Sequence, residues 1–216
     1  MNEVMRTRLV PSTLLWFSSV VILIVFAALA GCAIPGRADP ALSERLEQNG
    51  YSFMPPGESG WFIADRSSNR VTVARLGKVE GQTFLIEGTP LALDGLSTPA
   101  RLTGFVEDLH KRDLPPPRFR IREYDNSEIR IAGARCALSH IVAEDREPET
   151  ASNVVTAMLV ESVGTVCIHP TNAQLGIALN VSHRSFPEDR DRAFKAYAES
   201  LLKTQQFSDV NTQPAN

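Results

Sequence analysis

The stretch ARCALSHIVAEDREPETASNVVTAMLVESVGTVCIHP, residues 134–170, decides the fold, because it holds two apolar runs with a cysteine in each and a polar segment between them. If Cys136 and Cys167 face each other on antiparallel neighbouring strands, paired residue numbers sum to 303 and the connection centres near residues 151–152. That point falls inside the polar stretch EDREPETASN, residues 144–153. The spacing therefore predicts an antiparallel hairpin whose register is set by the two cysteines.

Other apolar runs bounded by turn residues predict further strands on both sides of this hairpin. Residues 118–124 alternate arginine with apolar residues, which is the pattern of a half-buried strand. We interpret Arg118, Arg120 and Arg122 as a solvated strand face, with an anion site as the alternative. The predicted strands occupy residues 51–65 in two pieces, 70–77, 82–93, 118–124, 128–143, 153–170 and 175–183.

Two segments carry apolar residues at helical spacing, one in mid-chain at residues 96–113 and one near the C-terminus at residues 185–207. Ser185 and Glu188 fit a capping box at the start of the second helix. A brief helix is also expected at residues 41–50, before the first strand. The expected buried stripes are Leu102, Phe105, Val106 and Leu109 in the mid-chain helix and Phe194, Tyr197, Ala198 and Leu201 in the C-terminal helix.

The order of these elements is strands, helix, strands, helix, and the connections between the later strands are short. Short connections favour antiparallel pairing. The sequence therefore predicts an α+β fold, a twisted and mostly antiparallel sheet of about six or seven strands packed against the mid-chain and C-terminal helices.

The N-terminal part contains an uncharged apolar run over residues 14–30, preceded by Arg6 and Arg8. The run is long for a signal-peptide core and short for a membrane-spanning helix. The run ends in Leu29-Ala30-Gly31-Cys32, a branched apolar residue and two small residues followed by a cysteine. The run can be interpreted as a cleaved signal peptide or as an uncleaved anchor helix that ends in an incidental cysteine. Both interpretations place the rest of the chain outside the cytoplasm.

The sequence LAGC at residues 29–32 resembles the lipobox of bacterial lipoproteins. The resemblance implies cleavage before Cys32, a diacylglycerol thioether on its sulfur, and acylation of the new N-terminus by a fatty acid such as palmitate. Three acyl chains anchor a protein far more firmly than one. In lipoproteins retained at the inner membrane, the residue after the cysteine tends to be aspartate. Here it is Ala33, so the resemblance implies an anchor in the outer membrane with the domain facing the periplasm. The organisation implied is a signal peptide over 1–31, a tether over 32–40, a single globular domain over 41–207 and a disordered tail over 208–216.

The exported part resembles the PsbP-like fold, the fold of periplasmic lipoproteins such as DcrB. The resemblance rests on element order: the PPGESGW turn at residues 55–61, the mid-chain helix, a long meander and a terminal amphipathic helix. Together with the lipobox, the stretches FMPPGESGW (53–61), VESVGTVCIHP (160–170) and SHR (182–184) are also similar to a group of uncharacterised proteobacterial envelope lipoproteins. That second resemblance implies a compartment and no activity.

Export bears on the three cysteines of the chain. Outside the cytoplasm Cys136 and Cys167 are expected to form a disulfide, with two buried free thiols as the alternative. An odd cysteine in an exported protein has another fate, and lipidation of Cys32 supplies it.

The histidines near the meander raise the question of a zinc site. In the predicted register Val163 lies opposite His140, and His169 is six residues further along the strand, roughly 20 Å away. Zinc ligands lie about 2 Å from one ion, so these two histidines do not share a metal. His183 beside His140 is the remaining pair, and separate histidines at strand ends are the simpler interpretation. We therefore expect neither a metal nor another cofactor.

Serine-based catalysis is also poorly supported. Ser139 and His140 are adjacent on a predicted strand, where neighbouring side chains point to opposite faces, so they do not form a nucleophile–base pair. Ser59 in GESG lacks the second glycine of a nucleophile elbow, because Trp61 stands there. Trp61 is either a core anchor or part of a groove. The residues left as a possible binding surface are Trp61, His140, Glu144, Asp145 and Arg184.

The formal net charge of −3, or −4 without residues 1–31, argues against nucleic acid, which needs a concentrated basic face. We therefore expect a non-catalytic binding or scaffolding domain held at a membrane by its lipid anchor. Its expected partner is another envelope protein, a glycan or a lipid headgroup. The alternative is a small periplasmic hydrolase or metal-dependent enzyme that uses His140 with Glu144 or Asp145.

Overall fold

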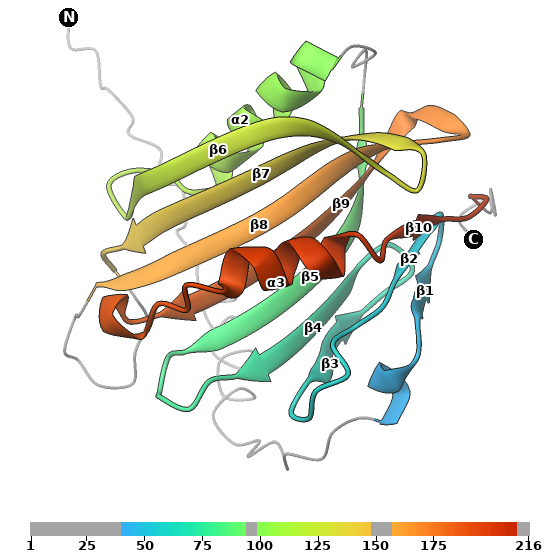
Figure 1. Cartoon of the computed structure of the whole chain (residues 1–216). Coiled ribbons are helices and arrows are strands. Elements are labelled where there is room, and N and C mark those ends of the chain that lie inside the picture. Colours follow the sequence, from blue (N-terminus) through green and yellow to red (C-terminus); the bar gives the residue numbers. More distant parts are fainter. Residues whose placement is uncertain (1–39, 94–98, 148–156, 211–216) are drawn as a thin grey trace, which may run out of the picture. The chain divides into compact units, whose positions relative to one another are not determined.

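A computed structural model describes residues 40–93, 99–147 and 157–210 of the chain. In it, an antiparallel sheet of seven strands carries one helix on each face, and a small sheet of three strands lies beside it (Figure 1). This confirms the predicted α+β class. The elements are η1 (Pro40–Ser43), β1 (Leu46–Gln48), β2 (Tyr51–Phe53), β3 (Phe62–Arg66), β4 (Val71–Leu76), β5 (Thr83–Ala92), α2 (Pro99–Asp113), β6 (Phe119–Ile131), β7 (Ala134–Asp145), β8 (Met158–His169), β9 (Asn172–Ser185), η2 (Pro187–Asp189), α3 (Phe194–Leu202) and β10 (Gln206–Phe207).

The large sheet has the strand order β3-β4-β5-β9-β8-β7-β6, and the small sheet has the order β1-β2-β10. Between β7 and β8 every paired position keeps the predicted sum, from Cys136 with Cys167 to Asp145 with Met158. The two cysteines form a disulfide across this pair of strands. The register read from the cysteines is therefore confirmed, while the connection at residues 148–156 lies outside the described residues.

The boundary between β6 and β7 differs from the prediction, which joined residues 128–143 into one strand. A two-residue turn at Ala132 and Gly133 divides this segment, and both residues have positive φ angles, 46° and 83°. Two left-handed residues build the turn that matches the twist of a hairpin. Glu128 to Ile131 therefore completes the long edge strand β6, and β7 begins only at Ala134.

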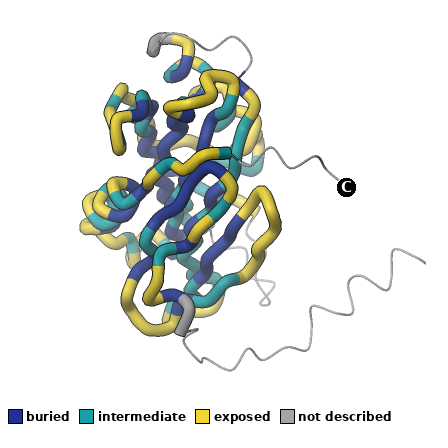
Figure 2. Tube along the Cα trace, turned by 90° about the vertical axis from the view of Figure 1, so that its right-hand side faces the viewer, coloured by how far each residue is buried: buried dark blue, intermediate teal, exposed yellow. Residues whose placement is uncertain are grey.

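The main hydrophobic core lies on the face of the sheet that carries α3. Side chains from β4, β5, β8 and β9 meet the buried stripe of α3 and the aromatic residues of β2 here. The Tyr51 ring lies so close to Gly88 that a Cβ at that glycine would be 2.7 Å from the ring. Burial is concentrated along the strands inside the domain, and the turns are exposed (Figure 2). The stripe predicted for α3 is confirmed, with Phe194, Ala198 and Leu201 buried and Tyr197 partly buried.

Helix α2 covers part of the opposite face. Its predicted stripe packs against Ala137 of β7 and Val166 of β8, together with Leu93 just beyond β5. On each strand the side chains in this cluster alternate with those in the main core, as in β9, where Ala178 faces α2 and Leu179 faces α3. Alternation along the strands thus divides the domain into an α2 face and an α3 face.

Two local predictions are wrong. The brief helix expected at residues 41–50 is a short 3-10 turn followed by β1. The capping box of Ser185 and Glu188 does not form, because η2 begins at Pro187 and α3 starts only at Phe194, after an extended Arg190. The structure describes the predicted tail only over residues 208–210, where the Ser208 N–H donates to the Gly50 carbonyl at 3.2 Å. Residues 211–216 lie outside the described residues.

Candidate functional site

The α2 face of the sheet is only partly covered by its helix. Beyond the C-terminal end of α2, strands β7, β8, β9 and β5 continue with small and polar side chains in place of a second apolar core. Backbone register arranges these side chains in rows that run across the four strands. Ala137, Val166, Ala178 and Thr89 form the row beneath α2, Ser139, Gly164, Asn180 and Glu87 form the next, and Ile141, Ser162, Ser182 and Leu85 form the third.

The rows and the C-terminal half of α2 enclose a cavity of about 340 Å³, which we call the α2 groove. Val106 and Leu109 of α2 form one apolar wall, and Ile141 and Val160 of the sheet form the other. Small-molecule sites occupy about 300–1,000 Å³ and combine apolar walls with a few polar groups. The α2 groove has both properties.

Two hydrogen bonds cross the floor of the α2 groove. Nε2 of His110 lies 2.8 Å from Oγ of Ser139, and Oγ of Ser162 donates to Oδ1 of Asn180 at 2.6 Å. Gly164 lies between Ser139 and Asn180 in the same row. A Cβ at Gly164 would come within 2.8 Å of Oδ1 of Asn180, so a larger residue would displace the amide.

His110 is the groove residue that the sequence analysis missed. Burial lowers the pKa of His110, and the charge of nearby Asp113 opposes this shift only in part, so the imidazole is neutral at neutral pH. The available signal was its place on the helix, four residues after the buried Val106. A polar residue that continues an apolar stripe needs a partner on the surface it faces, and Ser139 is that partner.

Asp145 and Arg184, two of the residues predicted for a binding surface, lie in a charge cluster at the end of the sheet. The Asp145 side chain is 1% exposed. Its carboxylate accepts hydrogen bonds from Nε and Nη2 of Arg118 at 3.1 and 3.2 Å and from Nη2 of Arg184 at 2.7 Å. Arg118 is therefore not part of a purely solvated strand face. The cluster neutralises a buried carboxylate, which corrects the expectation that Asp145 is exposed.

His140 lies on the α3 face, in a second charge network. Its Nε2 is 2.8 Å from Oε1 of Glu161, and both side chains are buried. Nε of Arg190 donates to Oε2 of Glu161 at 2.9 Å, and its Nη1 donates to Glu123 at 2.7 Å. The hydrogen bonds from Arg190 hold the pKa of Glu123 below its usual range.

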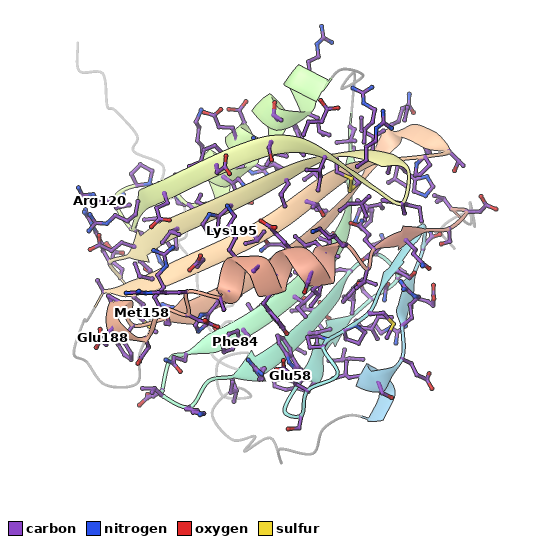
Figure 3. All side chains as sticks on the ribbon, in the orientation of Figure 1. Glu58, Phe84, Arg120, Met158, Glu188 and Lys195 are labelled. Atoms are coloured by element: carbon purple, nitrogen blue, oxygen red, sulfur yellow. A yellow bond between two sulfur atoms is a disulfide. The ribbon has the colours of Figure 1, made fainter. Side chains whose placement is uncertain are left out.

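A cavity of about 520 Å³ opens beside this network, and we call it the polar cavity. Glu188 of η2 and Lys195 of α3 lie among its lining residues, and Figure 3 labels both. Arg190 and Glu161 on its wall already neutralise each other, and Lys195 lies 3.8 Å from Asp125. Glu161, Arg190 and Lys195 of the polar cavity are thus each engaged in an ion pair.

The predicted cluster of His140, Glu144 and Asp145 is not assembled. Strand alternation places His140 and Glu144 on the α3 face and Asp145 on the α2 face. Glu144 pairs with Arg122 on the neighbouring strand, and His140 pairs with Glu161 instead. The acid–base pairs of the enzyme alternative therefore have no geometric basis in the described structure.

Trp61 is a core anchor and does not line a groove. It is 1% exposed and packs within the main core on the α3 face. The Arg75 guanidinium covers its ring, 5.0 Å from the ring centroid, and donates to Glu58 at 2.6 Å. The position of Trp61 removes it from the candidate binding surface.

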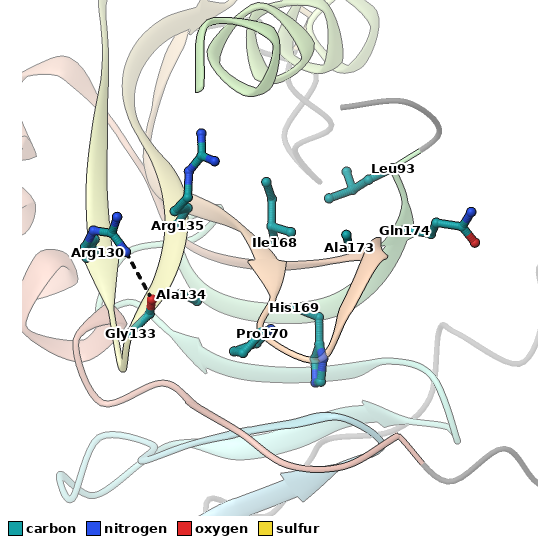
Figure 4. A pocket seen from close by; sticks show the side chains of 10 residues that line it. All are labelled: Leu93, Arg130, Gly133, Ala134, Arg135, Ile168, His169, Pro170, Ala173 and Gln174. Atoms are coloured by element: carbon teal, nitrogen blue, oxygen red, sulfur yellow. Dashed lines mark hydrogen bonds between the residues drawn. The ribbon is translucent and has the colours of Figure 1, made fainter. Parts of the chain in front are cut away.

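His169 has a structural role at the far end of β8. Its Nε2 lies 3.1 Å from the Gly50 carbonyl and 3.0 Å from the Ser208 carbonyl, while its Nδ1 accepts from the Thr171 N–H at 3.3 Å. A third cavity of about 500 Å³ lies beside His169, between the β6–β7 and β8–β9 turns (Figure 4). Its arginines are engaged, since Arg130 donates to the Gly133 carbonyl at 3.4 Å and Arg135 pairs with Glu128.

Over residues 40–93, 99–147 and 157–210, no three His, Cys, Asp or Glu side chains come together in a way that suits a metal ion. Within the same residues no helix has the length and apolar character needed to cross a membrane. Cys32, the residue predicted to carry lipid, lies outside the described part of the chain.

No protein-family model and no curated protein matches the sequence. Among solved structures the chain is similar to cyanobacterial PsbP (CyanoP) from Synechocystis sp. PCC 6803, with 14% identity, a TM-score of 0.48 and coverage of 84% of this chain and 99% of that one. It is also similar to a variant of the protein Mog1, with 10% identity, a TM-score of 0.45 and coverage of 77% and 96%. These likenesses concern the path of the chain alone.

Proposed function

We propose that the chain is a lipid-anchored envelope protein whose α+β domain binds a small ligand in the α2 groove without catalysing a reaction. The LAGC sequence at residues 29–32 supports the anchor, and the Cys136–Cys167 disulfide is in keeping with an oxidising compartment. A diacylglycerol on Cys32 would hold the domain at the periplasmic face of a membrane, and Ala33 favours the outer one.

The observation that carries the binding role is the polar floor of the α2 groove. Burying polar side chains costs desolvation free energy that their hydrogen bonds only offset, so apolar side chains of the same shape would serve stability equally well. Ser139 and Ser162 are nevertheless 3% and 8% exposed, on the interior strands β7 and β8 of the large sheet. Convergent polar groups beside apolar walls are typical of a ligand site.

A hydrolase would have to use the Ser139–His110 pair, because that is where a serine and a histidine meet in the α2 groove. A serine nucleophile also needs donors aimed at the developing oxyanion. Ser139 sits in the middle of β7, which pairs with β6 on one side and β8 on the other. The backbone N–H groups around Ser139 are engaged in hydrogen bonds between these strands, so they do not form an oxyanion hole. This arrangement favours binding over catalysis.

The anchor is tested with a Cys32→Ala variant expressed in a bacterium that processes lipoproteins. We expect the parent chain to fractionate with membranes and to carry the mass of three acyl chains on a polypeptide that begins at Cys32. The variant should lose both properties, with Ser127→Ala at an exposed position of β6 as the control that keeps Cys32 and the disulfide. A parent chain that retains residues 1–31 would contradict the anchor.

The groove is tested by photocrosslinking in the native envelope, with a benzophenone amino acid placed at Ser182 in one chain and at the exposed Ser127 of β6 in another. We expect the Ser182 chain to acquire a defined small-molecule adduct that is absent from the Ser127 chain. Adducts with one envelope protein at both positions would favour the scaffold role instead. Absence of any adduct at Ser182 would contradict a ligand in the α2 groove.

A further inference from the structure

The charged side chains that line the α2 groove are neutralised by other side chains of the protein. Glu87, the β5 residue of its row, pairs with Arg70 at 3.2 Å. Arg112 and Asp113, at the end of α2, pair with each other at 3.4 Å. Helix α2 also contributes His110 to the groove, and this imidazole is neutral and hydrogen-bonded to Ser139. The groove therefore presents no unpaired charge among its described residues.

Hydrogen-bonding capacity does remain on the floor. Within the described part of the chain, the hydroxyls of Thr89 and Ser182 make no hydrogen bond, and Asn180 uses its Oδ1 for Ser162. The amide nitrogen of Asn180 stays available as a donor. All three residues are half-buried, so water or a ligand is what completes their hydrogen bonds.

From this combination we infer that the ligand of the α2 groove is uncharged, with an apolar body and an amide or hydroxyl group that meets Asn180 and Ser182. The inference rests on the proposed binding function and adds the chemical class of the ligand. The apolar body would fill the space between Val106, Leu109 and Ile141.

Desolvation explains the preference for an uncharged ligand. A carboxylate or ammonium group that enters the groove loses its hydration, and only an opposite charge in the groove would offset this free-energy cost. The charged groups at the rim are already committed to each other. An amide loses less hydration, and the donors and acceptors of the floor can replace it.

The experiment uses the full chain reconstituted in lipid nanodiscs, with methyl-labelled isoleucine and valine, and three probes that share one apolar body. The probes are cyclohexanecarboxamide, cyclohexanecarboxylate and cyclohexylammonium. Methyl shifts of Ile141 and Val160 report on the α2 groove, and those of Ile86 and Val181 on the α3 face are the internal control. We expect the carboxamide to move the groove methyls alone, with an affinity about tenfold or more above that of either ion.

Two variants sharpen the result. Asn180→Leu removes the free donor at similar volume and should lower carboxamide affinity about tenfold, whereas Ser127→Ala on β6 should leave it unchanged. Binding of the carboxylate or the ammonium as tight as that of the carboxamide would overturn the inferred ligand class and leave the groove as a ligand site. If no probe moves the groove methyls more than the control methyls, both the inference and the proposed function are contradicted.

Discussion

The two faces of the large sheet are built by the same strands and differ in kind. On the α3 face, Leu179 and Val181 of β9 are fully buried against α3 and the small sheet. On the α2 face, the neighbouring Asn180 and Ser182 line a partly open groove. Since side chains alternate along a strand, one stretch of sequence serves a closed core on one side and an accessible polar floor on the other.

The comparison also separates two ways of burying polar groups. On the α3 face the polar residues His140 and Glu161 belong to a charge network that Arg190 completes. On the α2 face the hydroxyls of Thr89 and Ser182 make no hydrogen bond to the residues that the structure describes, so their capacity stays unused there. A satisfied network stabilises a fold, whereas unused capacity beside a cavity is available to a ligand.

The largest expected effect comes from truncating neighbouring residues on opposite faces. Leu179→Ala should lower the free energy of unfolding by about 3–5 kcal/mol, because it leaves a cavity in the main core. Asn180→Ala should cost at most about 1 kcal/mol, since it removes one hydrogen bond at an open site. Urea denaturation of both variants measures the difference. Equal losses would mean that the α2 face is as tightly packed as the α3 face.

The disulfide gives the next largest effect, because it fixes the register that sends each residue to its face. Replacing both Cys136 and Cys167 by alanine should lower the free energy of unfolding by about 3–4 kcal/mol, the chain-entropy value for a loop closed over 31 positions. Denaturation of the parent chain with a reductant should reproduce the loss. A reduced parent chain as stable as the oxidised one would show that the strand ladders alone carry the register.

Which of these features could be read from the sequence depends on the range of the interactions. The β7–β8 register was predictable, because the two cysteines and the position of the polar loop both give the same sum of paired residue numbers, 303. The division into faces follows from alternation. The reach of α2 over the sheet was not predictable, since it depends on how the helix docks on strands distant in sequence.

The contacts of the site show the same limit. His110 meets Ser139 only after α2 is placed, and Arg118 meets Asp145 only because β6 pairs with β7. His140 was expected to act with Glu144 or Asp145, its neighbours in sequence. Its partner Glu161 comes from the adjacent strand, two residues before Val163, which pairs with His140 in the ladder. Residues close in sequence along a strand do not meet here, because pairing between neighbouring strands decides which side chains are in contact.

A smaller effect is expected for the bond that ties α2 to the sheet. Ser139→Ala removes the partner of His110 and should lower the free energy of unfolding by about 1 kcal/mol. The loss should be local, so backbone amides in the last turns of α2 should exchange with deuterium faster while those of α3 do not change. Ser200→Ala on α3 is the matched control. Uniformly faster exchange in both helices would contradict a local tie.

The smallest effect concerns His183, which is buried on the α3 face. Burial lowers the pKa of His183 below its usual value, so below about pH 6.5 the unfolded chain binds more protons than the folded one. The free energy of unfolding should therefore fall as the pH drops through that value, and stability is fully present only above it.

A His183→Phe variant should weaken this pH dependence. The ring would keep the stacking on Phe84, whose centroid is 4.0 Å away, and would remove an Nδ1 that has no hydrogen-bond partner among the described residues. Urea midpoints at about pH 7.5 and pH 5.5 should lie closer together in the variant than in the parent chain. An unchanged interval between the midpoints would assign the acid sensitivity to other groups.

The most direct test of the division between a core face and a ligand face compares one chain from two sources by methyl NMR. One sample is isolated from its native envelope, and the other is refolded without envelope material. We predict that the methyl signals of Ile141 and Val160 in the α2 groove differ between the samples while those of Ile86 and Val181 coincide. Groove signals that coincide as closely as the core signals would contradict a ligand-binding α2 face.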